Sequence, residues 1–160
     1  LCVVKVFISH KKEDSLEARR IKLELDILGV EAYLDLLDSS IIGGGKSLTD
    51  HIKSQLNQCS DIIVVMSEAT KNSWWVPFEI GMAAQIDMPT ASYLTSSVKL
   101  PDYLEYWPRL KSVSDVATYV AVRNDVANDL KQRHPNIYSK PMYRPIETAI
   151  FYDEVKRKLR

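Results

Sequence analysis

Short β-branched and apolar segments alternate along this chain with longer segments of helical periodicity, and this alternation restricts the fold more than any other feature. The clearest strand is Asp61–Met66, which contains the longest apolar run. A segment over 13–28 repeats apolar side chains at helical spacing, and it is followed by Gly29, a residue typical of helix ends. Strands that alternate with helices predict βαβ units with right-handed crossovers and a parallel sheet.

The predicted fold class is therefore α/β, with an open parallel sheet that carries helices on both faces. Strands are expected over 3–9, 30–34, 61–66 and 90–94. Helices are expected over 13–28, 48–56, 72–87, 115–130 and 146–159. Ser47 and Asp50 resemble a capping box at the start of the second helix. A chain of 160 residues predicts one domain over 1–160, with a weaker pattern over 99–160.

Charge and cysteine content argue against several functions. Lys plus Arg and Asp plus Glu both number 21, so the chain lacks the basic surplus of a general nucleic-acid binder. The longest apolar run, 62–66, is too short to cross a bilayer, and no signal-peptide pattern opens the chain. Two cysteines and three widely separated histidines predict neither a disulfide framework nor a metal site. We therefore expect a cytoplasmic protein without nucleic-acid or membrane partners.

Polar residues follow each of the first three predicted strands. Ligands of open parallel sheets bind beyond the carboxyl ends of the strands. These segments are Ser9–Lys12, Asp35 with the loop over 36–46, and Ser67 with the segment over 74–79. They supply hydroxyls, cations, flexible backbone, aromatic surface and one carboxylate at what is predicted to be a single edge of the sheet. This mixture suits a nucleotide better than a plain acid or a sugar.

Three consecutive glycines in the loop over 36–46 precede Lys46 and Ser47 and raise the possibility of a P-loop. A P-loop needs Gly, four residues and then Gly-Lys-Ser/Thr, but Ser40 stands where the first glycine is required. Such an enzyme would also need a magnesium-binding acid at the end of the third strand, where Ser67 and Glu68 stand. A mobile surface loop is the favoured interpretation, with a nucleoside-triphosphate enzyme as the less favoured alternative.

Glu79 is the carboxylate of greatest interest. It lies within about a turn of a helix start, because Pro77 is best tolerated in a first turn. Trp75 stands four residues earlier and lies beside Glu79 if that turn is helical. On residue chemistry alone, a structural role is favoured for both side chains: the tryptophan packs the helix onto the sheet, and the glutamate is a solvated first-turn acid.

The chain resembles a TIR domain, in particular a bacterial one, in three segments. Val4–His10 resembles the first box of the family, a strand that ends in Phe-Ile-Ser. The segment over 33–48 resembles the second strand and the long BB loop, although three glycines stand where many members carry a Pro-Gly pair. Residues 61–67, followed by the tryptophans and glutamate of 73–79, resemble the third strand and the Ser-x-Trp to Glu pattern. The agreement runs from 3 to about 94, and 99–160 is not matched.

The resemblance implies a flavodoxin-like fold and one of two functions. The first is cleavage of the nicotinamide–ribose bond of NAD+, which yields nicotinamide and ADP-ribose or a cyclic isomer; the second is assembly as a non-catalytic scaffold. Glu79 falls on the family's catalytic glutamate, and with the resemblance included we favour catalysis by this residue. The candidate substrate-binding residues are Ser9, His10, Lys11, Asp35, Gly45, Lys46 and Trp75.

Several further expectations accompany this resemblance. NAD+ is consumed as a substrate, so neither a cofactor nor a metal is required. Self-association is expected through the loop over 36–46. A fused or partner sensor or effector domain is expected, because the chain opens on Leu1 rather than on a methionine. The resemblance also suggests a role in bacterial defence against phage.

Overall fold

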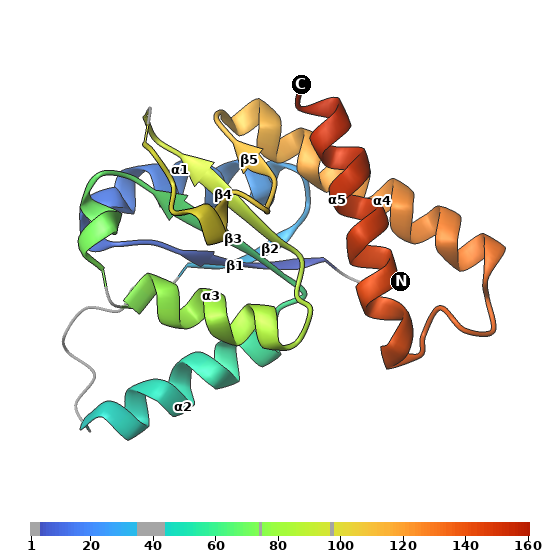
Figure 1. Ribbon diagram of the computed structural model, residues 1–160, viewed down its shortest axis with the longest axis horizontal. Helices are drawn as coiled ribbons and strands as arrows, with labels where there is room; N and C mark the ends of the chain where they lie inside the picture. The colour runs from blue at the N-terminus through green and yellow to red at the C-terminus, as the bar shows by residue number, and fades with distance from the viewer. Residues whose placement is uncertain (1–3, 35–43, 74, 97) are drawn as a thin grey trace.

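A five-stranded parallel sheet forms the centre of the molecule (Figure 1). The computed structural model describes residues 4–34, 44–73, 75–96 and 98–160. The strands are β1 (Lys5–Ser9), β2 (Glu31–Leu34), β3 (Asp61–Met66), β4 (Thr90–Leu94) and β5 (Arg109–Leu110). Their order across the sheet is β2-β1-β3-β4-β5, and every neighbouring pair is parallel. This order is the flavodoxin-like one.

Helices cover both faces of the sheet, as the alternation predicts (Figure 1). The helices are α1 (Ser15–Ile27), α2 (Gly44–Asn57), α3 (Trp75–Gln85), α4 (Val113–Arg133) and α5 (Arg144–Lys158). α1, α4 and α5 pack in one apolar core, and α2 and α3 pack in a second core on the opposite face. Gly29 ends α1 with a φ of +72°, a left-handed conformation that glycine adopts without steric strain. None of the helices in the described ranges combines the length and apolar character that a membrane crossing requires.

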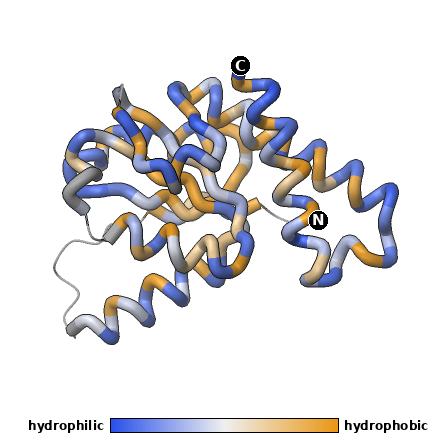
Figure 2. The backbone as a smooth tube through the Cα atoms, viewed as in Figure 1, coloured by the Kyte–Doolittle hydropathy of each residue, from blue (hydrophilic) through white to orange (hydrophobic). Residues whose placement is uncertain are grey.

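The strand β3 has a nearly continuous apolar sequence because both of its faces are covered. All six of its residues are buried. Ile63 and Val65 belong to the core under α1, α4 and α5, whereas Ile62, Val64 and Met66 belong to the core under α2 and α3. A central strand of a doubly covered sheet is buried on both faces, so it carries no polar alternation. The hydrophobic colouring of the central strands in Figure 2 follows this arrangement.

A buried charge network joins the start of β3 to α4 and α5. Arg123 of α4 donates from Nε to Asp61 Oδ1 at 3.0 Å and from Nη1 to Glu147 Oε1 of α5. The Tyr119 hydroxyl donates to the same Asp61 oxygen at 2.8 Å, and Ser60 Oγ donates to Asp61 Oδ2 at 2.6 Å. Burial alone would lower the pKa of the Arg123 guanidinium, but the two carboxylates raise it above its ordinary value. We call Asp61, Arg123 and Glu147 the Arg123 network.

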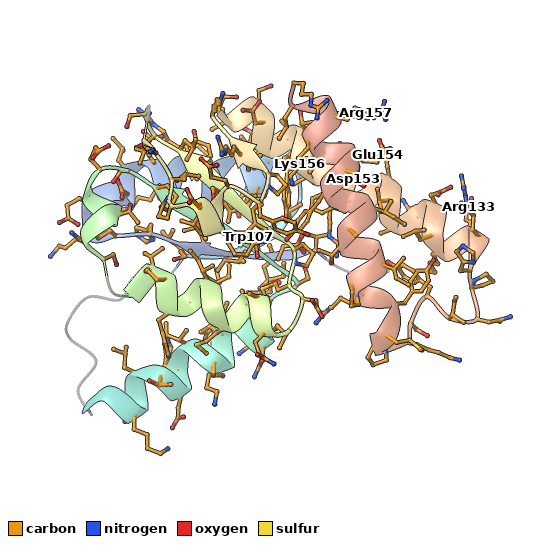
Figure 3. All side chains as sticks on the ribbon, in the orientation of Figure 1. Trp107, Arg133, Asp153, Glu154, Lys156 and Arg157 are labelled. Carbon is orange, nitrogen blue, oxygen red and sulfur yellow. The ribbon has the colours of Figure 1, made fainter. Side chains whose placement is uncertain are left out.

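Near its C-terminal end, α5 also contacts the segment that leads into β5. The Lys156 ammonium lies 4.9 Å from the ring centroid of Tyr106 and 5.8 Å from that of Tyr152, and it donates to the Tyr106 carbonyl oxygen. Burial lowers the pKa of Lys156. Figure 3 labels Lys156 on α5, together with Trp107 of the segment that precedes β5. Attraction between the cation and the ring faces therefore helps to hold α5 against this segment.

Several element boundaries differ from the sequence expectations. α2 begins at Gly44, so Gly45 and Lys46 are helical rather than part of the loop expected over 36–46, and Ser47 lies inside the helix instead of capping it. Two contacts between residues four positions apart stabilise this first turn. Thr49 Oγ1 donates to the Gly45 carbonyl oxygen at 2.9 Å, and Lys46 pairs with Asp50. β5 was not expected, and its two residues are too few to show a pattern.

Candidate functional site

The order of the strands places the topological switch point of the sheet between β1 and β3. After β1 the chain continues to β2, which lies on one side of β1 in the sheet, and it later returns to β3, which lies on the other side of β1. The connections that follow the two strands therefore run in opposite directions, and ligands of such folds bind at this switch point. The connection after β1 contains a short 3-10 turn, η1 (Lys12–Asp14), and the connection after β3 contains η2 (Ala69–Asn72).

A buried hydroxyl–carboxylate pair lies at this switch point. Ser9 is the last residue of β1, and its Oγ donates a hydrogen bond to Glu79 Oε2 of α3. Both residues have no exposed surface, at 0% each. Successive side chains of a strand alternate between faces, so Ser9 points to the same side as Phe7, toward the layer of α2 and α3. Pro77 lies in the first turn of α3, as expected, which puts Glu79 about one turn into the helix.

His10 and Lys11 extend the site on the other side of β1. His10 Nε2 lies 3.4 Å from Ser15 Oγ at the start of α1, and its buried Nδ1 has no hydrogen-bond partner among the described residues. Burial lowers the pKa of His10 below 6.5, which favours a neutral ring at neutral pH. Lys11 Nζ donates to the Ala69 carbonyl oxygen at 3.2 Å and lies 3.4 Å from Glu13 Oε1. Lys11 thus joins the connection after β1 to the connection after β3.

A second buried carboxylate lies between the same two connections. Asp14 Oδ2 accepts hydrogen bonds from Ser67 Oγ at 2.7 Å and from Thr70 Oγ1 at 3.1 Å. Neither Asp14 nor Thr70 is predicted as a site residue from the sequence. Asp14 falls at the start of the helix expected over 13–28, and no spacing in the sequence links it to residues more than 50 positions away.

An apolar cleft of about 450 Å³ borders the start of α3. Val76, Pro77 and Ile80 of α3 form one wall, and Val98, Lys99, Leu100, Pro101, Asp102 and Leu104 form the other. Thr70 and Met66 also line it, whereas Glu79 does not.

The remaining candidate residues do not join the Ser9–Glu79 pair in the described structure. Gly45 and Lys46 lie exposed in the first turn of α2, and the Lys46 side chain is 89% exposed and pairs with Asp50 at 2.6 Å. The hydrogen bond that the Lys46 ammonium donates to the Asp50 carboxylate raises the pKa of Lys46. Asp35 lies outside the described residues. Trp75 begins α3, but its side chain is outside the described part of the chain.

The chemistry available at the site is that of carboxylates, hydroxyls and one ammonium. No group of three His, Cys, Asp or Glu side chains suited to a metal occurs among the described residues. Cys59 is buried, and burial raises the pKa of its thiol to about 11, so it is not an activated nucleophile. A single buried carboxylate with an oriented oxygen suits stabilisation of a developing positive charge.

The comparisons with known proteins agree with this architecture. A family model described as a TIR domain matches residues 6–133, from β1 to the last residue of α4. No curated protein matches the chain at a significant level. The TIR domain of the Toll-related receptor TRR-2 from Hydra magnipapillata is similar with a TM-score of 0.56 and 14% identity, over 79% of this chain and 97% of that one.

Two further solved structures are similar to this chain. A 2-deoxyribosyltransferase from Bacillus psychrosaccharolyticus gives a TM-score of 0.58 at 12% identity, over 71% of this chain and 90% of that one. The TIR domains of the activated Roq1 resistosome give a TM-score of 0.47 at 13% identity, over 96% of this chain and 82% of theirs. At such identities the first of these establishes a shared fold, and we draw no argument from the second.

Proposed function

The chain belongs to the TIR-domain family, and on that premise we propose that it cleaves NAD+ at the bond between nicotinamide and ribose. The products are nicotinamide and ADP-ribose or a cyclic isomer. The observation that carries this proposal is the buried Ser9–Glu79 pair, in which a carboxylate is held at the switch point of the sheet by the last residue of β1.

The reaction needs only one carboxylate beside the ribose, and Glu79 is proposed to supply it. When the bond breaks, its electron pair leaves with the nicotinamide nitrogen, and nicotinamide departs as a neutral molecule that needs no proton. Positive charge then develops on the ribose, and a carboxylate beside it stabilises that charge. Attack on the same ribose carbon by water, which loses a proton to solvent, gives ADP-ribose. Attack by a nucleophilic atom of the same nucleotide, with loss of its proton, gives a cyclic isomer. Neither route requires a metal or a second acid.

Within this proposal Ser9 serves Glu79 rather than the substrate. Its hydroxyl is fully buried and already donates to Glu79 Oε2, so it fixes the direction in which the carboxylate points. Burial of the pair also removes water that would screen the carboxylate from a developing charge. The residues that remain proposed as substrate-lining are His10, Lys11, Asp35, Gly45, Lys46 and Trp75.

The alternative proposal is a non-catalytic TIR scaffold. Large apolar side chains on the outer face of α1 favour assembly, since Leu16, Leu23 and Ile27 are all more than 60% exposed. Self-association through the loop over 36–46 and a role in bacterial defence are proposed on the family resemblance alone. A scaffold has no need of a buried Ser9–Glu79 pair, so activity distinguishes the two proposals.

Nicotinamide release from NAD+ tests the proposed function, with mass spectrometry of the products. Glu79→Gln keeps the size of the side chain and removes its charge, and we expect at least about a 100-fold loss of turnover, the scale for removal of one electrostatic stabiliser. Glu105→Gln is the matched control, because Glu105 is an exposed acid that pairs with Arg109. Near-wild-type turnover by a folded Glu79→Gln protein would refute the catalytic role of Glu79. Assembly by a wild-type protein that releases no nicotinamide would favour the scaffold.

A further inference from the structure

Hydrogen bonds join Asp14 to the first turn of α3 in a continuous series. Thr70 Oγ1 donates to Asp14 Oδ2 at 3.1 Å, and the Ser73 backbone N–H donates to the Thr70 carbonyl oxygen at 2.9 Å. The Val76 N–H, in the first turn of α3, donates to Ser73 Oγ at 3.3 Å. The first of these bonds crosses from Asp14 to Thr70, and the other two join residues three positions apart along the chain that leads into α3. Hydrogen bonds therefore connect Asp14 to the helix that carries Glu79.

Two stretches of backbone and the Ser9–Glu79 hydrogen bond close this series into a ring. Glu79 follows Val76 by three residues on α3 and accepts the hydrogen bond from Ser9. Ser9, the last residue of β1, precedes Asp14 by five residues along the chain, and it lies in register with Val64 of β3. We call this closed series, from Ser9 through Asp14, Thr70, Ser73 and Val76 to Glu79, the switch-point ring.

Further contacts fix the two connections to each other within the ring. Ser67 Oγ donates to the same Asp14 oxygen at 2.7 Å, and the Ser67 backbone N–H donates to Thr70 Oγ1 at 3.0 Å. Lys11 Nζ donates to the Ala69 carbonyl oxygen. A buried carboxylate that receives two hydroxyl hydrogen bonds holds both hydroxyls in fixed positions, because such charge-assisted bonds are short and strong.

We propose that Asp14 is a positioning residue for the reaction at Glu79. It holds the turn at 67–73 and thereby the start of α3, so that the Glu79 carboxylate stays directed by Ser9 at the switch point. This inference rests on the proposed function and names a residue that never touches the substrate. Small displacements of a catalytic group reduce the rate by about 100-fold for 1 Å, so a loosened α3 lowers turnover more than it lowers substrate affinity.

Three variants separate positioning from general stability. Asp14→Ala removes the acceptor of both hydroxyls. Asp14→Asn restores a carbonyl oxygen that accepts the same two hydrogen bonds. Tyr119→Phe is the matched control, because it also removes a hydroxyl–carboxylate hydrogen bond from the buried interior, but at Asp61, the first residue of β3, whereas the ring lies beyond the last residue of that strand.

Two measurements are made on all three proteins and on the wild type. Steady-state kinetics of nicotinamide release should show that Asp14→Ala lowers kcat by about 10- to 100-fold while KM changes less than about threefold. Asp14→Asn should recover most of the loss, and Tyr119→Phe should keep the wild-type kcat. Hydrogen exchange at the Ser73 and Val76 amides should become about tenfold faster in Asp14→Ala and stay unchanged in Tyr119→Phe.

The exchange measurement keeps this inference separate from the proposed function. Unchanged exchange at both amides in Asp14→Ala overturns the inference, whatever the activity. An equal loss of kcat in Tyr119→Phe also overturns it, because a general loss of stability then explains the effect. If the wild type releases no nicotinamide, the proposed function fails, while faster exchange in Asp14→Ala still supports the role of Asp14 in holding the start of α3.

Discussion

Replacing Arg123 by methionine should strongly destabilise the folded chain. Methionine keeps the unbranched stem of arginine but removes the guanidinium that bridges Asp61 and Glu147. Asp61 then remains with no exposed surface and keeps, among the described side chains, the hydroxyl donors of Tyr119 and Ser60. Glu147 retains the Tyr138 hydroxyl at 3.3 Å. One fully buried carboxylate and one partly buried carboxylate thus lose their shared cation.

The size of the effect follows from these contacts. Breaking a buried ion pair from one side costs about 3–5 kcal/mol, and the remaining hydroxyl donors place this case near about 3 kcal/mol. For a chain of this size each 1 kcal/mol lowers Tm by about 2–4 °C, which gives a decrease of about 6–12 °C. The double variant Asp61→Asn with Arg123→Met should be more stable than Arg123→Met alone, because it removes one of the uncompensated charges.

Urea unfolding followed by circular dichroism measures these differences, with Arg133→Met as the matched control. Arg133 pairs with Asp129 on the exposed surface of α4 at 2.8 Å, a kind of contact worth only about 0.3–0.5 kcal/mol. A loss for Arg123→Met that equals the loss for Arg133→Met would refute the reasoning, because the Arg123 network would then contribute no more than a surface pair.

Three other changes have expected outcomes. Trp75→Ala should change the ratio of cyclic to linear product, or lower activity, with only a small decrease in Tm. Product analysis and thermal unfolding of the same protein measure these effects. Loss of folding without an active remnant would favour a purely structural tryptophan. Specific activity should rise with protein concentration, and charged replacements of Ile41 and Ile42 should reduce that rise; full activity in a demonstrably monomeric sample would contradict it. His10 has a folded-state pKa below the unfolded value of 6.5, so the unfolded state binds more protons and the free energy of unfolding should fall as pH decreases below about 6.5. His10→Gln should flatten that part of a urea-unfolding profile between pH 7 and 5, and an identical slope in both proteins would count against the burial of this ring.

The parts of the fold that the sequence predicts well are those fixed by local chemistry. The bounds of β3 and β4 are as expected, and in β3 the apolar run that follows Asp61 is typical of a strand covered on both faces. Pro77 correctly placed Glu79 near the start of α3, since proline is tolerated in a first turn. These inferences need only neighbouring residues.

The parts that the sequence does not predict depend on contacts between distant segments. Arg123 lies in a helix whose other polar residues are mostly exposed, and nothing in its spacing indicates that Asp61 and Glu147 surround it. Asp14 likewise resembles any acid before a helix, and its partners at 67 and 70 meet it only when β1 and β3 pair. The roles proposed for Asp35 and the loop that follows it fall outside the described residues and stay predictions.

The complete burial of Glu79 has a consequence for the timing of the proposed reaction. A carboxylate with no exposed surface cannot meet a dissolved nucleotide, so an uncovering step must come before bond cleavage. If the nucleotide binds only uncovered molecules, its apparent affinity and the kcat/KM of the reaction both fall in proportion to the uncovered fraction. A neighbouring protomer, a higher temperature or a mutation that changes only this fraction would alter kcat/KM without changing the chemistry of the bond. A substrate analogue soaked into a rigid lattice of this conformation would find the carboxylate closed, whereas the same analogue present during crystal growth would select the open form.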